Sequence, residues 1–308
     1  MYDHDPGVTK RAYGELSSQQ MVDELLRLVN VEALEKADGE AGLFRGRRRR
    51  GGEGRVYGGQ VIAQALAAAS KTVEEGRQVH SLHAYFLRGG SEEHEIDYRV
   101  AADFDGGSFS NRRVVAMQQD KVIFNLAASF HKPERGHELR PAMPDVPPPE
   151  KLMSIAEFIE AHPERTPRVI ARSHRSPTPI EVRCVGAPPF WTDSAGEPEL
   201  ALWFRVARPV EGPQWLHRAL LAYASDYTMV ATMLRGHEPF DVQAASIDHS
   251  LWFHQDVEMG EWLLFTTQSP WTGAGRGFSL GQIYNRAGEL VASVAQEGLI
   301  RDPALRAG

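Results

Sequence analysis

Three polar residues in the second half of the chain interrupt apolar patterns and are the first candidates for chemistry: Asp226, Ser246 and Gln296. Asp226 lies in a helical pattern whose same-face neighbours are mostly apolar, and a carboxyl group in such surroundings has a perturbed pKa and often a functional role. Gln296 ends the apolar stripe of a predicted strand, and Ser246 begins another strand. Taken singly, each residue also fits a purely structural role, so the three alone do not define a reaction.

A serine hydrolase is suggested by residues 277–281 (GFSLG), which match the nucleophile motif G-x-S-x-G. That motif requires a strand, a turn and a helix, with a histidine later in the chain. Here a second strand is predicted instead, and no histidine follows His254. We therefore predict a structural role for Ser279 and disfavour a serine hydrolase.

The sequence contains no clear metal or phosphate motif. The two histidines of one predicted strand, His80 and His83, point to opposite faces because side chains alternate along a strand. A single cysteine, Cys184, excludes an internal disulfide framework and a Cys-rich zinc site. Gly58-Gly59 lacks the spacing of a dinucleotide-binding or phosphate-binding loop. We predict that the protein uses no metal and no cofactor.

The composition narrows the class of protein. The 308 residues include 34 Lys and Arg against 41 Asp and Glu, a net charge of −7, which argues against nucleic acid as a partner. No apolar stretch reaches the roughly 18 residues that cross a membrane. The N-terminus is acidic rather than a secretory signal, and the C-terminal LRAG is neither a peroxisomal nor a retention signal. We expect a cytoplasmic protein with no membrane partner.

Two halves with the same order of elements follow a short tail. We predict a tail over 1–20, a first unit over 21–140, a proline-rich linker over 141–165 and a second unit over 166–308. Each unit is expected to hold a leading strand, one central helix and about four antiparallel strands, an α+β arrangement in which a sheet wraps around a helix. Helices are predicted at 21–37, 61–73, 152–162 and 216–235. Strands are predicted at 79–87, 95–102, 112–119, 122–131, 180–185, 200–207, 246–254, 261–269, 278–285 and 290–299.

Six separated motifs resemble the signatures of type II acyl-CoA thioesterases. They are RVYGGQ (55–60), HSLHAYFLR (80–88), GSFSNRR (107–113), YASD (223–226), IDHSLWFH (247–254) and VASVAQEG (291–298). The resemblance runs in order and with compatible spacing from about residue 21 to residue 301. It implies a double hotdog fold, in which one chain holds two helix-in-sheet units, and hydrolysis of acyl-CoA to the free acid and CoA.

The resemblance also implies roles for individual residues. The family's catalytic aspartate and glutamine fall on Asp226 and Gln296, and Ser246 stands where the family has a threonine. Asp226 would act as general base toward a water that the other two side chains hold. Gly59, at the start of a helix, would offer a backbone N–H to the oxyanion.

Cations are needed for the CoA phosphates, and four arginines are candidates: Arg88, Arg112, Arg113 and Arg276. The arginine run at 47–50 departs from the family pattern and lies near the expected site entrance. Such a run is more often a solvated loop. The resemblance further implies a homo-oligomer, a dimer or a tetramer, because hotdog sheets often pair edge to edge or back to back.

Two other functions stay open at this point. A hotdog enoyl-CoA hydratase or dehydratase generally uses an Asp/His pair, but the adjacent Asp248 and His249 point to opposite sides of their predicted strand. A non-catalytic acyl-CoA sensor would bind the same ligand without releasing thiol.

Overall fold

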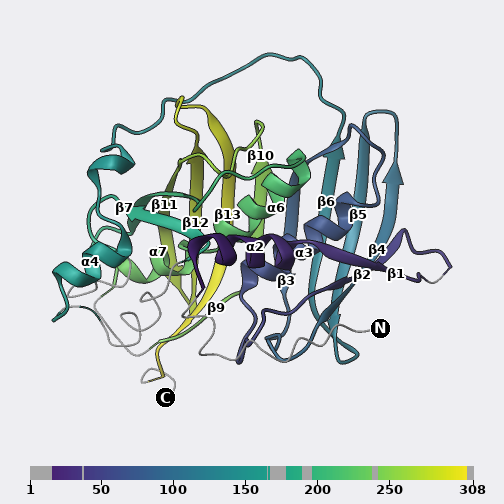
Figure 1. The fold of residues 1–308 in the computed structure, drawn as a ribbon, viewed down its shortest axis with the longest axis horizontal. Helices are drawn as coiled ribbons and strands as arrows, with labels where there is room; N and C mark the ends of the chain where they lie inside the picture. The colour runs from purple at the N-terminus through teal and green to yellow at the C-terminus, as the bar shows by residue number, and fades with distance from the viewer. Residues whose placement is uncertain are drawn as a thin grey trace.

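The fold is one continuous antiparallel sheet whose two halves each surround a central helix (Figure 1). The computed structural model describes residues 16–36, 38–164, 166, 178–188, 196–237 and 242–303. Within these ranges, thirteen strands form the sheet. No helix among them is long and apolar enough to cross a membrane.

The first half of the sheet contains six strands and the second half seven. The first six are β1 (Val31–Leu34), β2 (Gly42–Gly46), β3 (Gln78–Phe86), β4 (Ile96–Asp105), β5 (Phe109–Gln118) and β6 (Lys121–His131). The others are β7 (Ile180–Cys184), β8 (Glu199–Val206), β9 (Gln243–Ser246), β10 (Asp248–Phe253), β11 (Leu263–Gly273), β12 (Arg276–Tyr284) and β13 (Leu290–Arg301).

The strand order is symmetric about the centre of the sheet. It runs β1-β2-β4-β5-β6-β3 and then β10-β13-β12-β11-β8-β7, so the second half repeats the first in reverse. The halves join where β3 pairs with β10, with Leu82 opposite Leu251. The expected repeat of a sheet around a helix is therefore present, and the joint makes one sheet of the two units.

The packing of two buried helices against each other explains why the sequence of the first is rich in alanine. Helix α3 (Gly58–Ser70) is buried along almost its whole length, and its small side chains allow helix α6 (Gln214–Ser225) to pack against it. The two helices run in opposite directions, since the start of α3 lies near the end of α6 and Lys71 at the other end of α3 lies over Trp215. This arrangement brings the N-terminus of one helix to the C-terminus of the other. The helix that packs on β8, β11, β12 and β13 of the second half is a third one, α7 (Met229–Arg235).

The N-terminal helix differs from its prediction. Helix α2 covers Ser18–Val29 rather than 21–37, because Ser17 and Gln20 form a capping box that starts it earlier. The chain then leaves the helix at Asn30 and forms β1, which pairs with β2. The single leading strand predicted for this unit, without bounds, is a pair of strands of four and five residues, of which β1 forms the edge of the sheet.

The long helix predicted at 216–235 is interrupted. Helix α6 ends at Ser225, and helix α7 (Met229–Arg235) begins after a gap of three residues. The Ser225 hydroxyl bonds back to the carbonyl of Ala222, and Ser, Asp and Thr side chains of this kind compete with helical hydrogen bonds. The interruption moves Asp226 from the helix interior, where we predicted it, to the end of α6.

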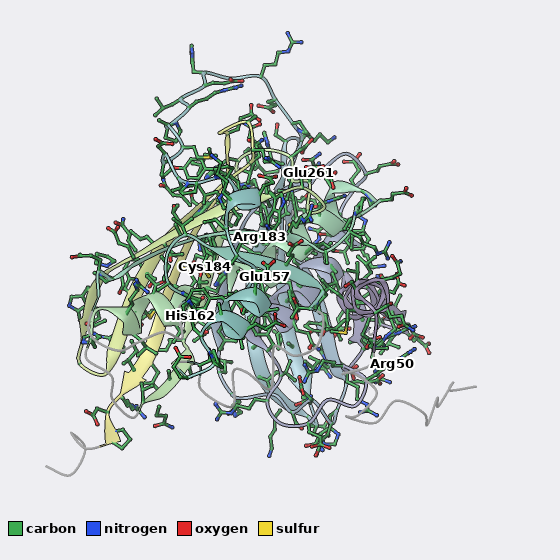
Figure 2. The ribbon with its side chains drawn as sticks, turned by 60° about the vertical axis from the view of Figure 1, so that its left-hand side comes forward. Arg50, Glu157, His162, Arg183, Cys184 and Glu261 are labelled. Atoms are coloured by element: carbon green, nitrogen blue, oxygen red, sulfur yellow. The ribbon has the colours of Figure 1, made fainter. Side chains whose placement is uncertain are left out.

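The connection between the halves crosses over one end of the molecule (Figure 1). Residues 132–148 contain no helix or strand, as their prolines predict. A short 3₁₀ turn, η1 (Pro149–Lys151), and helix α4 (Ile155–Ala161) follow, close to the predicted helix at 152–162. Figure 2 shows the side chains of Glu157 and His162 on this segment beside those of Arg183 and Cys184. Helix α4 thus covers β7 and closes one side of the second half.

Candidate active site

Asp226 lies between the ends of the two central helices. It is the C-cap of α6, and only 9% of its surface is exposed. Its carboxylate faces the first turn of α3 so closely that a Cβ on Gly58 would lie 2.6 Å from Oδ2. A Cβ on Gly59 would lie 2.2 Å from the carbonyl oxygen of Tyr223. The paired glycines are therefore needed for the approach of the two helices.

The start of α3 gains an anionic partner from this approach. Tyr57, the N-cap of α3, makes no side-chain capping bond, although the first N–H groups of a helix need acceptors. The backbone of Gly59 is hydrogen-bonded to the Asp226 carboxylate, which lowers the pKa of that carboxyl. Gly59, the predicted oxyanion donor, thus lies in the site, and in this structure its N–H faces the carboxylate.

Ser246 and Gln296 meet Asp226, although the three come from distant parts of the chain. The Ser246 hydroxyl donates to Asp226 Oδ1 at 3.2 Å, and Gln296 Nε2 donates to Ser246 Oγ at 2.9 Å. Gln296 is completely buried on β13, and Ser246 is the last residue of β9. The three candidate residues named from the sequence therefore form one hydrogen-bonded group in the fold.

A β-bulge orients this group. Strand β9 pairs with β13 through Ser246 and Gly298, whereas β10 pairs with it through Ser250 and Ala295, so the register slips by one residue between them. Asp248 Oδ1 accepts the N–H of Glu297 at 2.7 Å within the slip. In a regular strand Ser246 and His249 would point to opposite faces, and the bulge directs both inward.

His249 extends the group and was missed as a site residue. Its ring is completely buried, with Nδ1 2.5 Å from Gln296 Oε1 and Nε2 2.9 Å from Ser225 Oγ. The signal was present in the sequence, because alternation places His249 on the same strand face as Leu251 and Phe253. His254, outside that alternation, is exposed and bonds to Ser293.

Burial changes the pKa values of the two titratable residues in this hydrogen-bonded group, Asp226 and His249. Desolvation raises the pKa of Asp226 to about 6, and the hydrogen bonds from Ser246, Gln296 and Gly59 limit the increase. Desolvation also lowers the pKa of His249 to about 4, so its ring is neutral at physiological pH. A carboxyl group with a pKa near neutrality suits a general base.

A cavity of about 510 Å³ reaches the end of α6, although Asp226, Ser246 and Gln296 are not among the residues that line it. One part of its lining is formed by Tyr57, Tyr223, Ala224 and Tyr227, which are in or near the last turn of α6 and the start of α3. The Tyr57 hydroxyl donates to the Tyr223 carbonyl at 3.0 Å and so ties the start of α3 to the end of α6. The rest of the wall is largely apolar and comes from α4, β7, β8 and β11: Ile155, Ala156, Ile180, Val182, Leu202, Phe204 and Phe265.

One arginine of the 47–50 run reaches the cavity. Arg49 lines it and bonds to Glu92 at 2.9 Å, with about half of its side chain exposed. Arg50 and Arg47 pair with Glu24 and Glu32 on α2 and β1. This run therefore lies beside the cavity, and Arg49 was not singled out from the sequence.

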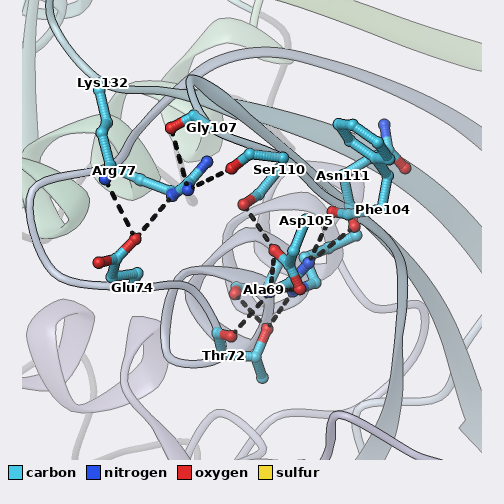
Figure 3. Close-up of polar contacts among 12 residues, drawn as sticks. Ala69, Thr72, Glu74, Arg77, Phe104, Asp105, Gly107, Ser110, Asn111 and Lys132 are labelled. Carbon is cyan, nitrogen blue, oxygen red and sulfur yellow. Dashed lines mark hydrogen bonds and ion pairs between the residues drawn. The ribbon is translucent and has the colours of Figure 1, made fainter.

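The four arginines predicted to bind phosphate lie in different settings. Arg112 is buried, and its guanidinium bonds to Thr72 and to the Asp105 carboxylate (Figure 3). Arg112 is therefore part of the interior of the first half, where it has a structural role and is not accessible to a phosphate.

The other three arginines lie at the surface in separate places. Arg113 pairs with Asp103. Arg88 donates to the Val122 carbonyl, and Arg276 pairs with Glu297 near Ser246. The structure does not bring the four together.

The serine of the GFSLG motif has a structural contact, as predicted. Ser279 is completely buried on β12 and donates to the Met229 carbonyl at 3.0 Å, where α7 begins. All five residues of the motif lie within strand β12, so the turn and the helix that a nucleophile motif requires are not there. In the described part of the chain, no three His, Cys, Asp or Glu side chains are grouped as metal ligands would be.

Known proteins resemble the chain in sequence and in structure. Profiles of the acyl-CoA thioesterase N-terminal domain and C-terminal domain match residues 47–131 and 147–300. Human acyl-coenzyme A thioesterase 8 is 36% identical over 89% of this chain and 88% of its own length. The acyl-CoA thioesterase II TesB2 of Mycobacterium marinum is 34% identical, with a TM-score of 0.73 over 90% of this chain and 97% of that one. A hot dog fold protein of Alicyclobacillus acidocaldarius, 18% identical, superposes with a TM-score of 0.69 over 92% and 98% of the two chains.

Two helix-in-sheet units in one chain, with a polar group where their helices meet, define a double hotdog protein. The similarity in sequence covers both units. The chain belongs to the acyl-CoA thioesterase family.

The buried carboxylate predicts a variant that is more stable than the natural protein. The pKa of Asp226 rises from an ordinary value of 3.8 to about 6 on folding, so the folded state binds more protons between these pH values and stability falls as the pH rises through them. Two pKa units correspond to about 3 kcal/mol. We expect Asp226→Asn to raise the free energy of unfolding by up to that amount at pH 8 and to leave it unchanged near pH 4, as measured by chemical denaturation.

The difference in the free energy of unfolding between the natural protein and Asp226→Asn isolates the contribution of Asp226, because His249 titrates in both proteins. A variant less stable than the natural protein at pH 8 would mean that the hydrogen bonds to the carboxylate outweigh its desolvation.

Proposed function

We propose that the protein hydrolyses acyl-CoA thioesters to the free acid and CoA, with Asp226 as general base. The observation that carries the proposal is the buried group of carboxylate, hydroxyl and amide beside a largely apolar cavity. Membership of the acyl-CoA thioesterase family supports the substrate class.

The reaction needs one water and no covalent intermediate. Asp226 takes a proton from the water while the water oxygen attacks the thioester carbonyl, which gives a tetrahedral intermediate with an anionic oxygen. Collapse of the intermediate breaks the C–S bond, and the proton returns from Asp226 to the departing sulfur. The products are one carboxylic acid and one thiol, so that atoms and charge balance.

Ser246 and Gln296 orient the base and the water in this scheme. The Ser246 hydroxyl donates to Oδ1 of the carboxylate, and the water would bond to a lone pair that Ser246, Gln296 and Gly59 do not use. Serine keeps the hydroxyl of the family's threonine but lacks the methyl group that restricts its rotamers, and here the bond from Gln296 holds it. The oxyanion requires N–H donors, for which the first turn of α3 with Gly59 is our candidate. The Gly59 N–H is bonded to Asp226 in this structure and would be released to the oxyanion when Asp226 takes the proton of the water.

The cavity fits the acyl chain, and its entrance fits a charged group. The apolar wall of Val182, Leu202 and Phe265 accepts methylene groups. Arg49 lies on the same cavity and provides a cation toward the phosphates of CoA. In this proposal the thioester carbon lies in the part of the cavity lined by Tyr223 and Ala224, which precede Asp226 in the chain.

The two alternative functions are less well supported. Asp248 bonds to the backbone of Glu297, whereas His249 points into the interior, so the pair that a hydratase or dehydratase needs does not converge. A sensor would not require a base whose pKa is raised to about 6. The assay below distinguishes a sensor, because saturable binding without thiol release would identify one.

We further propose a cytoplasmic homo-oligomer, a dimer or a tetramer. Several strands of the sheet carry exposed large apolar side chains, which contact with a second copy would remove from water. They include Tyr85, Phe104, Phe109, Trp271 and Leu280.

Removal of the base or of the amide should abolish turnover. We expect Asp226→Asn to lower kcat by about 100-fold or more, since general base catalysis contributes ~10²–10⁴-fold, and Gln296→Ala to cause a loss of the same order. Release of thiol from acyl-CoA measures the rate, and circular dichroism checks the fold. Ser279→Ala is the matched control and should keep nearly full activity, since only a serine hydrolase would lose it. Full activity of either site variant would contradict the assignment.

The activity should depend on pH through one acidic group. Because only the ionised carboxylate accepts a proton, kcat should rise tenfold per pH unit below about 6 and become constant above it. A pH profile of thiol release, corrected for spontaneous hydrolysis, measures the midpoint. A midpoint near 4 would mean that the base is an ordinary exposed carboxyl group.

Narrowing the cavity should change chain-length preference. Val182→Phe adds bulk to the apolar wall and should lower kcat/KM for palmitoyl-CoA by about tenfold or more, while butyryl-CoA, which does not reach that depth, is hydrolysed at nearly the natural rate. Val115→Phe on β5, outside the cavity lining, is the control. Equal losses with both substrates would place the acyl chain elsewhere.

A further inference from the structure

His249 is a completely buried titratable group that the proposed reaction does not use. It does not contact Asp226 directly. Its two ring nitrogens instead contact Gln296 on one side and Ser225 on the other, at 2.5 and 2.9 Å. A buried polar ring persists only when both nitrogens have suitable partners, so the direction of each hydrogen bond is informative.

The directions follow from Asp226 outward. An ionised carboxylate only accepts, so the Ser246 hydroxyl must donate its single hydrogen to Asp226. Ser246 Oγ is then left as an acceptor, and the Gln296 Nε2 hydrogen bonds to it. The oxygen Oε1 of the same amide therefore faces His249, and Nδ1 of His249 must carry a hydrogen.

The neutral ring makes this arrangement specific. Because burial lowers the pKa of His249 to about 4, the ring carries one hydrogen only. With that hydrogen on Nδ1, Nε2 can only accept, so the single hydrogen of the Ser225 hydroxyl is shared between Nε2 at 2.9 Å and the Ala222 carbonyl at 3.0 Å. The other tautomer would place two acceptors against each other at Nδ1 and Gln296 Oε1. A flipped amide would turn Oε1 toward Ser246 and reverse every bond, which requires a protonated and therefore inactive Asp226.

We propose that His249 is a positioning residue of the hydrolysis: its Nδ1–H fixes the Gln296 amide in the orientation that keeps the Ser246 hydroxyl directed at Asp226. This inference rests on the proposed function for its effect on rate. Its effect on Asp226 itself does not depend on any reaction.

The first half of the sheet shows that an apolar residue can fill such a position. Leu82 is completely buried on β3, as His249 is on β10, and the two strands are counterparts in the symmetric sheet. Leu82 pairs with Ala128 on β6, whereas the place of this alanine is taken in the second half by Gln296 on β13. His249→Leu is therefore expected to fold, with the donor removed and the bulk retained.

Three variants test the proposal. His249→Leu should lower kcat by about 10- to 100-fold with little change in KM, because a buried acceptor on Gln296 loses its donor and the amide is no longer fixed. His249→Asn places a side-chain N–H near the position of Nδ1 and should recover most of the rate. His254→Leu, at the exposed end of the same strand, is the control and should behave as the natural protein.

A double variant separates positioning from a general effect on structure. On a Gln296→Ala background, His249→Leu should cause no further loss of kcat, since the residue acts through the amide. Losses that multiply in the double variant would overturn the proposal, as would full activity of His249→Leu.

The pKa of Asp226 provides a readout that needs no activity. Ser246, Gln296 and Gly59 hydrogen-bond to the carboxylate and do not titrate in this range. Tyr57 is a titratable group that interacts with the Asp226 charge. Loss of the ordered donors should raise the pKa of Asp226 by about one unit in His249→Leu. This shift is measured from the pH dependence of stability with and without Asp226→Asn. If the natural protein releases no thiol, the proposed function fails, and this measurement still decides the inference: an unchanged pKa would overturn it.

Discussion

The structure depends on one buried carboxylate held where two helices meet. At the end of α6 the carbonyl groups present partial negative charge, which disfavours the Asp226 anion, whereas the first N–H groups of α3 favour it. The two helices must therefore approach closely enough for α3 to compensate, and Gly58 and Gly59 permit that approach. The three-residue gap between α6 and α7 is part of the same constraint, because an uninterrupted helix would hold Asp226 along its side and away from α3.

Burial acts in opposite directions on the two titratable groups of the site. It raises the pKa of Asp226 to about 6 and lowers that of His249 to about 4, so between these values both are neutral. Above that interval charge enters the interior as a single anion on Asp226, and below it as a cation on His249. A protonated His249 would supply a second hydrogen that neither Gln296 nor Ser225 requires. Neutrality of the ring is thus a condition for a hydrogen-bond chain that runs in one direction.

Most strands, the repeat and the residues of the site were predictable from the sequence, for physical reasons. Alternation is strong in the central strands, and the mostly apolar surroundings of Asp226 and Gln296 made both exceptional. The features that the sequence did not predict depend on tertiary contacts. Strands β1 and β2 are short, and the interruption after Ser225 follows from hydroxyl and carboxyl groups whose partners are distant. A bulge of one residue at Ile247 leaves no periodic signal, although it decides which side chains face inward.

The same sheet position has a structural role in both halves, but the helix ends of the two halves differ in charge. Arg112 stands three residues into β5, as Ser279 does in β12, counting 109 to 112 and 276 to 279. Its guanidinium bonds to the carbonyl of Thr72, just after α3 ends, where a cation is favoured by the helix dipole. At the end of α6 the chain places Asp226, an anion that the dipole disfavours. The first half therefore satisfies its helix end, whereas the second half maintains an unfavourable charge whose free energy is reduced when the carboxylate accepts a proton.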